Sequence, residues 1–146
     1  MSGYKHVLFA TDLSERALRV GERAKEIAQC YGARLSLIHV IEETSINAGY
    51  ELVPLLPELP DDAMLREAND NLGQLANNLG LPDAERWAIM ATSTKEGILR
   101  AAREHHVDLI VVGSRGRHGL ALLLGSTANA VLHGAPCDVL AVLIKD

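Results

Sequence analysis

Five short apolar runs recur along the chain, most of them rich in β-branched residues. Apolar runs of this length, bounded by glycine, proline or polar residues, are typical of strands buried on both faces of a sheet. They predict strands over residues 6–10, 34–41, 85–90, 108–112 and 137–144. The fourth of these strands is expected to end at Gly113.

Between the runs, apolar residues return every three or four positions, which is the spacing of one face of a helix. This pattern predicts helices over residues 15–31, 63–79, 94–105 and 127–133. Polar residues with short side chains precede each helix and are the expected N-caps: Ser14, Asp61 or Asp62, Ser93 and Ser126. Ser93 and Glu96 also have the spacing of a capping box.

Strands and helices therefore alternate from the first strand to the last. This order predicts an α/β fold: an open five-stranded parallel sheet with helices on both faces and right-handed crossovers. The length of 146 residues suits a single domain over residues 1–146. Residues 42–60 have no clean period and contain three prolines. Connections this long are usually functional or mobile.

Composition narrows the class of protein. Aromatic residues make up 3% of the chain and the net charge is −5, which disfavours a nucleic-acid-binding protein. The sequence has no signal-peptide pattern, and each apolar run is far shorter than the ~20 residues that cross a bilayer. Cys30 and Cys137 form no paired motif, as expected of buried thiols in a reducing compartment. We expect a soluble cytoplasmic protein with no membrane partner.

The stretch after the fourth strand is rich in glycine, with Gly113, Gly116, Gly119 and Gly125 preceding the last helix. Glycines let the backbone approach an anion closely, and free N–H groups at a helix start point toward it. The pattern indicates a phosphate-binding loop. The same glycines would also permit a tight connection that binds nothing.

Other catalytic and metal motifs are absent from the sequence. There is no H-E-x-x-H or C-x-x-C spacing, no Walker loop and no G-x-G-x-x-G turn after the first strand. A phospho-receiver would need an acidic pair after the first strand, where Asp12 stands alone. His39 lies within a predicted strand, so it is expected to be a hydrogen-bonded structural residue. No catalytic residue and no metal site is predicted.

The glycine-rich stretch resembles the signature of the universal stress protein family, G-x2-G-x9-G-[ST]. Here Gly113 and Gly116 are followed by Gly125-Ser126-Thr127, with eight residues between Gly116 and Gly125 in place of nine. The resemblance extends over YKHVLFATDLSE, LSLIHV and DLIVVGSRG through APCDVLAV. It implies an adenine nucleotide alpha-hydrolase-like sheet with strand order 3-2-1-4-5. That order would place Asp12 beside Gly113 at a topological switch point.

The resemblance also implies a ligand, ATP or AMP, with Mg²⁺ carried mainly by the phosphates. In nucleotide-binding relatives the residue matching Asp12 lines the nucleoside pocket, and the position of Val40 offers backbone groups to adenine. Asp12 would otherwise be an acid stabilised by a helix N-terminus. The expected nucleotide contacts are Ala10, Thr11, Asp12, Val40, Val112, Gly113, Gly116, Arg117, His118, Gly119, Gly125, Ser126 and Thr127. Arg117 and His118 are equally compatible with a solvated loop.

Three functions stay open at this point. The first is a regulatory adenine-nucleotide-binding module of the stress response that acts as a homodimer. The second is a stress protein of the universal stress protein A type that binds no nucleotide and acts through protein contacts. The third is an ATPase, which would be slow because no motif places a general base beside the phosphates. In the family the last strand pairs with its twin, so the expected dimer contacts are Val139, Leu140, Ala141, Val142 and Leu143.

Overall fold

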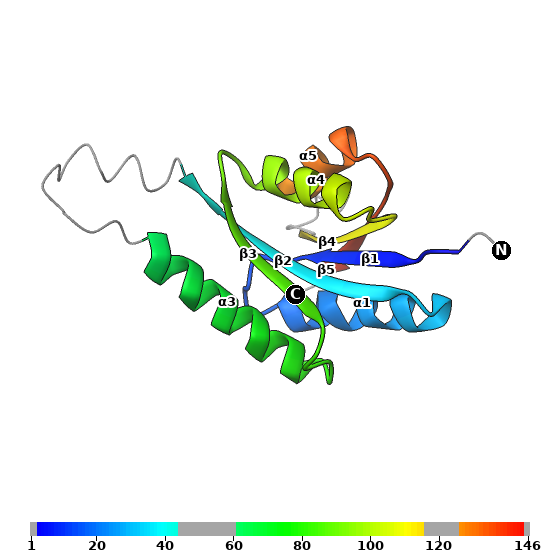
Figure 1. Cartoon of the computed structure of the whole chain (residues 1–146). Coiled ribbons are helices and arrows are strands. Elements are labelled where there is room, and N and C mark those ends of the chain that lie inside the picture. The colour runs from blue at the N-terminus through cyan, green and yellow to red at the C-terminus, as the bar shows by residue number, and fades with distance from the viewer. Residues whose placement is uncertain (1–2, 44–60, 116–125, 145–146) are drawn as a thin grey trace, which may run out of the picture.

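The computed structural model describes residues 3–43, 61–115 and 126–144. Strands and helices alternate within them (Figure 1), and the predicted α/β class is confirmed. The elements are β1 (His6–Ala10), α1 (Ala17–Tyr31), β2 (Arg34–Glu42), α3 (Asp61–Asn78), β3 (Glu85–Ala91), α4 (Thr94–Glu104), β4 (Leu109–Arg115), α5 (Ser126–Gly134) and β5 (Asp138–Ile144). Most of the long connection expected over 42–60 lies outside the described residues.

The five strands form one parallel sheet in the order β3-β2-β1-β4-β5, which confirms the expected strand order. Helices α1 and α3 cover one face of the sheet, and α4 and α5 cover the other (Figure 1). Crossovers between parallel strands place helices on the faces, and a sheet covered in this way needs strands that are apolar on both sides.

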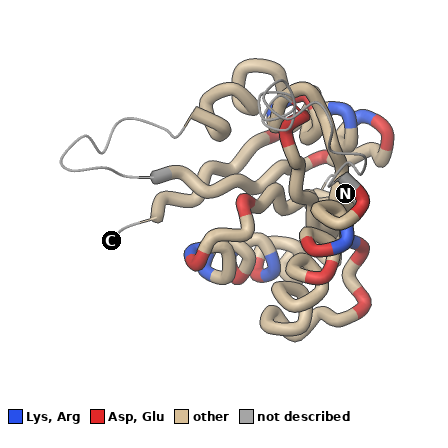
Figure 2. The backbone as a smooth tube through the Cα atoms, turned by 90° about the vertical axis from the view of Figure 1, so that its left-hand side faces the viewer, with Lys and Arg blue, Asp and Glu red and all other residues tan. Residues whose placement is uncertain are grey.

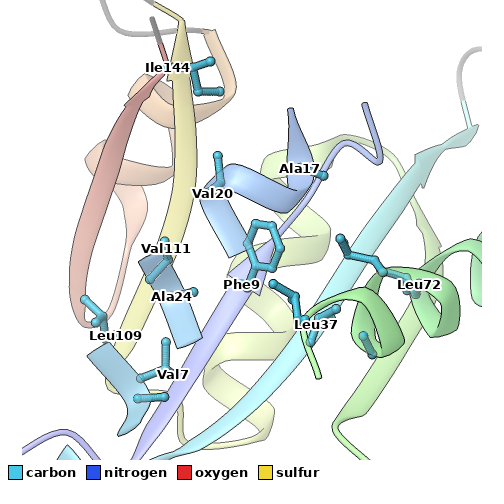
Figure 3. Packing of buried hydrophobic residues seen from close by; sticks show 14 residues of the cluster. Val7, Phe9, Ala17, Val20, Ala24, Leu37, Leu72, Leu109, Val111 and Ile144 are labelled. Carbon is cyan, nitrogen blue, oxygen red and sulfur yellow. The ribbon is translucent and has the colours of Figure 1, made fainter. Parts of the chain in front are cut away.

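Side chains along the central strands alternate between two apolar clusters. Val7 and Phe9 face α1 and α3, whereas Leu8 faces α4 and α5. Figure 3 shows the ring of Phe9, which is 1% exposed, between Val20 of α1 and Leu37 of β2. Charged residues lie mainly on helices and connections (Figure 2), and β1 carries none. Burial of apolar side chains on both faces therefore fixes β1 at the centre of the sheet.

The first helix starts later than its cap signal predicts. α1 begins at Ala17, its N-cap is Arg16, and no side chain caps it, so the prediction of Ser14 as N-cap is wrong. The Ser14 carbonyl accepts the N–H of Ala17 at 3.0 Å. The segment before α1 thus forms a separate turn. The cap at Ser93 is confirmed, because its Oγ accepts the N–H of Glu96 at 3.1 Å.

Gly113 does not end β4, which continues to Arg115 beside β5. A Cβ at Gly113 would lie 3.0 Å from the δ-carbon of Ile144 and 3.1 Å from a γ-carbon of Val20. Glycine therefore leaves room above β4 for the side chains of Val20 from α1 and Ile144 from β5. The expected end of the strand is wrong because this glycine serves packing within an extended strand.

Two further expectations are corrected. Cys30 is exposed, because it lies two positions beyond the buried Ala28 and so points away from the face of α1 that covers the sheet. Ser126 is the first residue of α5, one position inside the helix for which it was expected to be the N-cap. In the ranges that the structure describes, no helix is long and apolar enough to cross a membrane.

Candidate functional site

The carboxyl end of the sheet is indented at its central strand. β1 stops pairing where Ala10 lies opposite Ile38 of β2 and Val112 of β4. β2 continues beside β3 to Glu42, and β4 continues beside β5 to Arg115. This backbone indentation, called the β1 notch below, has residues 10–12 at its base and residues 39–42 and 113–115 on its two sides.

The chain leaves the base of the notch through a tight turn fixed by its own side chains. Thr11, which is 8% exposed, donates its N–H to the carbonyl of Ile38 at 2.9 Å and accepts the N–H of Leu13 on Oγ1 at 3.0 Å. Oδ1 of Asp12 accepts the N–H of Ser14 at 2.9 Å. Leu13 has a φ of +59°, a left-handed conformation that is strained for a side chain of this size.

This turn changes the interpretation of Asp12. The carboxylate is exposed and precedes α1, whose first turn contains no acidic residue. A helix-dipole role therefore does not apply to Asp12, since that effect is confined to the first turn of a helix. The carboxylate lies at the base of the notch, with one oxygen engaged in the turn.

The β2 side of the notch is held by buried contacts. Val40 is 6% exposed and packs toward Gly97 of α4, so it could offer a ligand only its backbone. His39 is half-buried and its Nδ1 lies 2.8 Å from the carbonyl oxygen of Thr11, which confirms the prediction that it is hydrogen-bonded. The carboxylate of Glu42 accepts the N–H of Thr94 at 2.9 Å, which ties the end of β2 to the start of α4.

The structure brings some of the predicted site residues together, and others lie outside the described residues. Ala10, Thr11, Asp12, Val40, Val112 and Gly113 lie at the carboxyl ends of β1, β2 and β4. Val112 is buried in the cluster beneath α4 and α5. Ser126 and Thr127 are exposed at the start of α5. Gly116, Arg117, His118, Gly119 and Gly125 lie outside the described residues.

Sequence patterns gave no sign of the left-handed Leu13 or of the partner of His39. A leucine carries no turn signal, and the bond from His39 joins β2 to the turn that follows β1, which is far away in the sequence. Within residues 3–43, 61–115 and 126–144, no three His, Cys, Asp or Glu side chains are grouped so that they could hold a metal ion.

A second group of buried polar side chains lies at the opposite, amino-terminal end of the sheet. His6 is 3% exposed, with Nε2 2.8 Å from Ser36 Oγ and Nδ1 3.0 Å from the carbonyl oxygen of His105. Burial lowers the pKa of His6, and the nearby Arg34 guanidinium acts in the same direction. His6 is therefore favoured in its neutral form.

Two more groups with shifted pKa values lie near the start of β5. Burial, followed by the charge of Asp138, raises the pKa of the Cys137 thiol to about 11. The hydroxyl of Tyr4 donates to Asp138 at 2.7 Å, and this bond raises the pKa of Tyr4 to about 12. Both groups are thus protonated at neutral pH.

The sequence model of the universal stress protein family matches residues 3–142 of the chain. Universal stress protein A homolog 1 of Coxiella burnetii is 42% identical over 144 residues, which cover 98% of this chain and 99% of that protein.

The solved structures agree with this. A universal stress protein crystallised in complex with cAMP is 30% identical and has a TM-score of 0.65. The match covers 99% of this chain and 100% of that protein's chain. Universal stress protein UspA from Lactobacillus plantarum is 26% identical and has a TM-score of 0.69. This match covers 97% of this chain and 99% of that protein's chain. The sheet is of the alpha/beta nucleotide-hydrolase-like type. The chain belongs to the universal stress protein family.

Proposed function

We propose that this universal stress protein is a regulatory module that binds an adenine nucleotide, ATP or AMP, at the β1 notch. The observation that carries the proposal is the register of the sheet, in which β2 and β4 both extend beyond β1. Ligands of open parallel sheets bind outside the carboxyl ends of the strands, where the strand order reverses. The relative in complex with cAMP supports an adenine nucleotide as the ligand class.

The residues of the notch and of the start of α5 have proposed roles. The Asp12 carboxylate accepts hydrogen bonds from the ribose or the adenine, and the backbone at Val40 meets the adenine edge. Gly113 and the start of α5, at Ser126 and Thr127, belong to the phosphate end. Mg²⁺ accompanies the phosphates, because the described part of the notch offers few oxygen ligands of its own and Mg²⁺ keeps several waters.

The test starts from purified protein that has seen no added nucleotide. The protein is denatured, and any released small molecule is identified by chromatography and mass. The same preparation is titrated with ATP and with AMP by calorimetry, with and without Mg²⁺. Released adenine nucleotide or saturable binding supports the proposal. A protein that is empty and gives no heat with either nucleotide contradicts it and favours action through protein contacts.

Asp12→Asn locates the binding site. Asparagine keeps an oxygen that can accept the N–H of Ser14, so the turn stays intact while the charge is lost. Hydrogen bonds to charged groups contribute about 1.5–3 kcal/mol, so affinity should fall about 10-fold or more. Asp83→Asn, at an exposed acid between α3 and β3, is the matched control and should bind normally. Equal affinity in the two variants would move the site away from the notch.

We also propose that the active form is a homodimer paired through β5. This strand is an edge of the sheet, and its residues 139–142 are half-buried while Leu143 is 44% exposed. An apolar edge of this kind favours pairing with another strand.

Leu143→Glu should give monomers in analytical ultracentrifugation, because the new charge would be buried at the interface without a partner. Leu132→Glu, at a leucine of α5 that is 50% exposed, is the control and should leave the dimer intact. A dimer that survives Leu143→Glu would place the interface elsewhere.

A further inference from the structure

We propose that His39 is a positioning residue for the nucleotide: its ring holds the Thr11 carbonyl and thereby fixes the turn that presents Asp12. The inference rests on the proposed function, because it concerns the same notch. In this view a side chain of β2, His39, sets the direction of Asp12, the residue after β1 that contacts the ligand.

The hydrogen bond from His39 fixes the orientation of its ring and shows which ring nitrogen carries the hydrogen. Its Nδ1 lies 2.8 Å from the Thr11 carbonyl oxygen. A carbonyl can only accept, so Nδ1 carries the hydrogen and donates it. Ile38 and Val40 belong to the cluster beneath α4 and α5, so His39 lies on the opposite face of β2, the face that α1 and α3 cover. The ring is therefore on the side of the sheet toward which the chain turns from β1 into α1.

Thr11 is the first residue beyond the pairing of β1. Its N–H still bonds to the Ile38 carbonyl at 2.9 Å, while its own carbonyl meets the His39 ring. The peptide groups on both sides of Thr11 are thus tied to β2, one by a backbone group and one by a side chain. A residue held at both ends gives the following turn a fixed starting direction.

The turn that follows needs such restraint. Leu13 occupies the left-handed region at a φ of +59°, and conformations of this kind are strained for a leucine. They persist only where surrounding contacts hold them. The restraints here are the bond from Leu13 to Thr11 Oγ1, the bond from Ser14 to Asp12 Oδ1, and the His39 bond that anchors Thr11 itself. Loss of the His39 donor releases the turn at its origin, and the Asp12 carboxylate loses its set direction.

A purely structural histidine would behave differently. Its removal would lower the free energy of unfolding and leave the affinity of the folded protein unchanged. A positioning histidine changes the affinity of the folded protein, and the change depends on the donor at the Nδ1 position. The two roles are therefore separated by affinity, by a conservative variant and by the local dynamics of the turn.

The experiment uses three variants of the full chain. His39→Leu removes the donor, and His39→Asn keeps an N–H donor close to the position of Nδ1. Lys25→Met is the control, because it removes a side-chain bond of similar length, 2.7 Å from Lys25 Nζ to the Leu79 carbonyl, away from the notch. For each variant, ATP affinity is measured by calorimetry, stability by urea unfolding, and amide exchange at Leu13 and Ser14 by NMR without nucleotide.

His39→Leu should bind ATP about 10-fold more weakly and exchange the Leu13 and Ser14 amides faster, the loss expected for one hydrogen bond. His39→Asn should recover affinity to within about 2-fold and slow the exchange again. Lys25→Met should lose stability and keep both its affinity and the slow exchange.

Normal affinity in His39→Leu, or an affinity in His39→Asn as weak as in His39→Leu, overturns the positioning role and leaves the proposed function standing. Absence of ATP and AMP binding in the unmodified protein overturns the proposed function and, with it, this inference.

Discussion

Replacing Gly97 by alanine tests how tightly α4 packs on β2 beside the notch. A Cβ at position 97 would lie 2.7 and 2.8 Å from the two γ-carbons of Val40 and 3.3 Å from the Cβ of Ala91. Valine is branched at Cβ, so rotating one methyl away brings another group into the same space. The helix or the strand must therefore move.

The expected magnitude follows from two opposing effects. Overpacking a well-filled core costs about 1–3 kcal/mol, whereas alanine is about 1 kcal/mol better than glycine inside a helix. Since two contacts fall below 3.0 Å, the steric cost belongs in the upper half of its range. We expect Gly97→Ala to lower the free energy of unfolding by about 1–2 kcal/mol.

Urea unfolding followed by circular dichroism measures this change, and a double-mutant cycle isolates its cause. Val40→Ala alone should also destabilise the protein, because it removes two buried methyl groups. In the double variant the new methyl at position 97 enters the space vacated by Val40. The double variant should therefore be more stable than the sum of the single changes, by about 1 kcal/mol or more.

The control is Gly73→Ala in α3, where the nearest atoms are the end of the Arg86 side chain at 3.2 Å. A flexible guanidinium can move aside, so this variant should be neutral or slightly stabilised. A Gly97→Ala variant as stable as Gly73→Ala would contradict the predicted clash with Val40. So would changes at positions 97 and 40 whose effects on stability simply add.

Two predictions concern the titratable groups. The pKa of His6 is lowered in the folded protein, so the stability linked to it is present above the unfolded value of about 6.5 and is lost as the pH falls through the folded value. The urea midpoint should therefore drop on acidification below about pH 6, and a His6→Gln variant should lose less over the same range. At neutral pH a thiol reagent should modify the exposed Cys30 quickly. It should modify Cys137, whose pKa is raised to about 11, only in urea; mass mapping of native protein that finds Cys137 modified first would contradict this.

The fold class could be predicted from the sequence because each strand is apolar on both faces. Val7, Leu8 and Phe9 are each almost completely buried, although they face opposite clusters. Such a run needs cover on both sides, which helices that alternate with parallel strands provide. The strand order carries no such signal, since pairing joins residues far apart in sequence. It was predicted correctly only through the family resemblance.

The shape of the site could not be predicted in the same way. The notch exists because β1 stops at Ala10 while β2 and β4 continue, and this depends on pairing register rather than on any one residue. Ser14 illustrates a second reason. A serine before a helical pattern has the same appearance whether it caps the helix or joins a turn, and here the polar side chains of the turn compete for the backbone and delay the helix.

Gly113 illustrates a third reason. In a sequence, a glycine near the end of a strand suggests a turn or an anion loop. In the structure Gly113 lies within β4, where the side chains of Val20 and Ile144 fill the space of the missing side chain. Close packing and close approach to a ligand both require a missing Cβ, so only the three-dimensional neighbours distinguish them.

The residues of the notch are held in place from the core side. Val40 packs against Gly97 of α4, and Gly113 packs against side chains from α1 and β5. Thr11 is held by two hydrogen bonds to β2. Any ligand that binds there meets a backbone whose position is set by packing on both faces of the sheet. Changes in packing and changes in direct contact should therefore have different signatures. Gly97→Ala should weaken nucleotide binding and stability together, because it acts through Val40, whereas Asp12→Asn should weaken binding with little loss of stability.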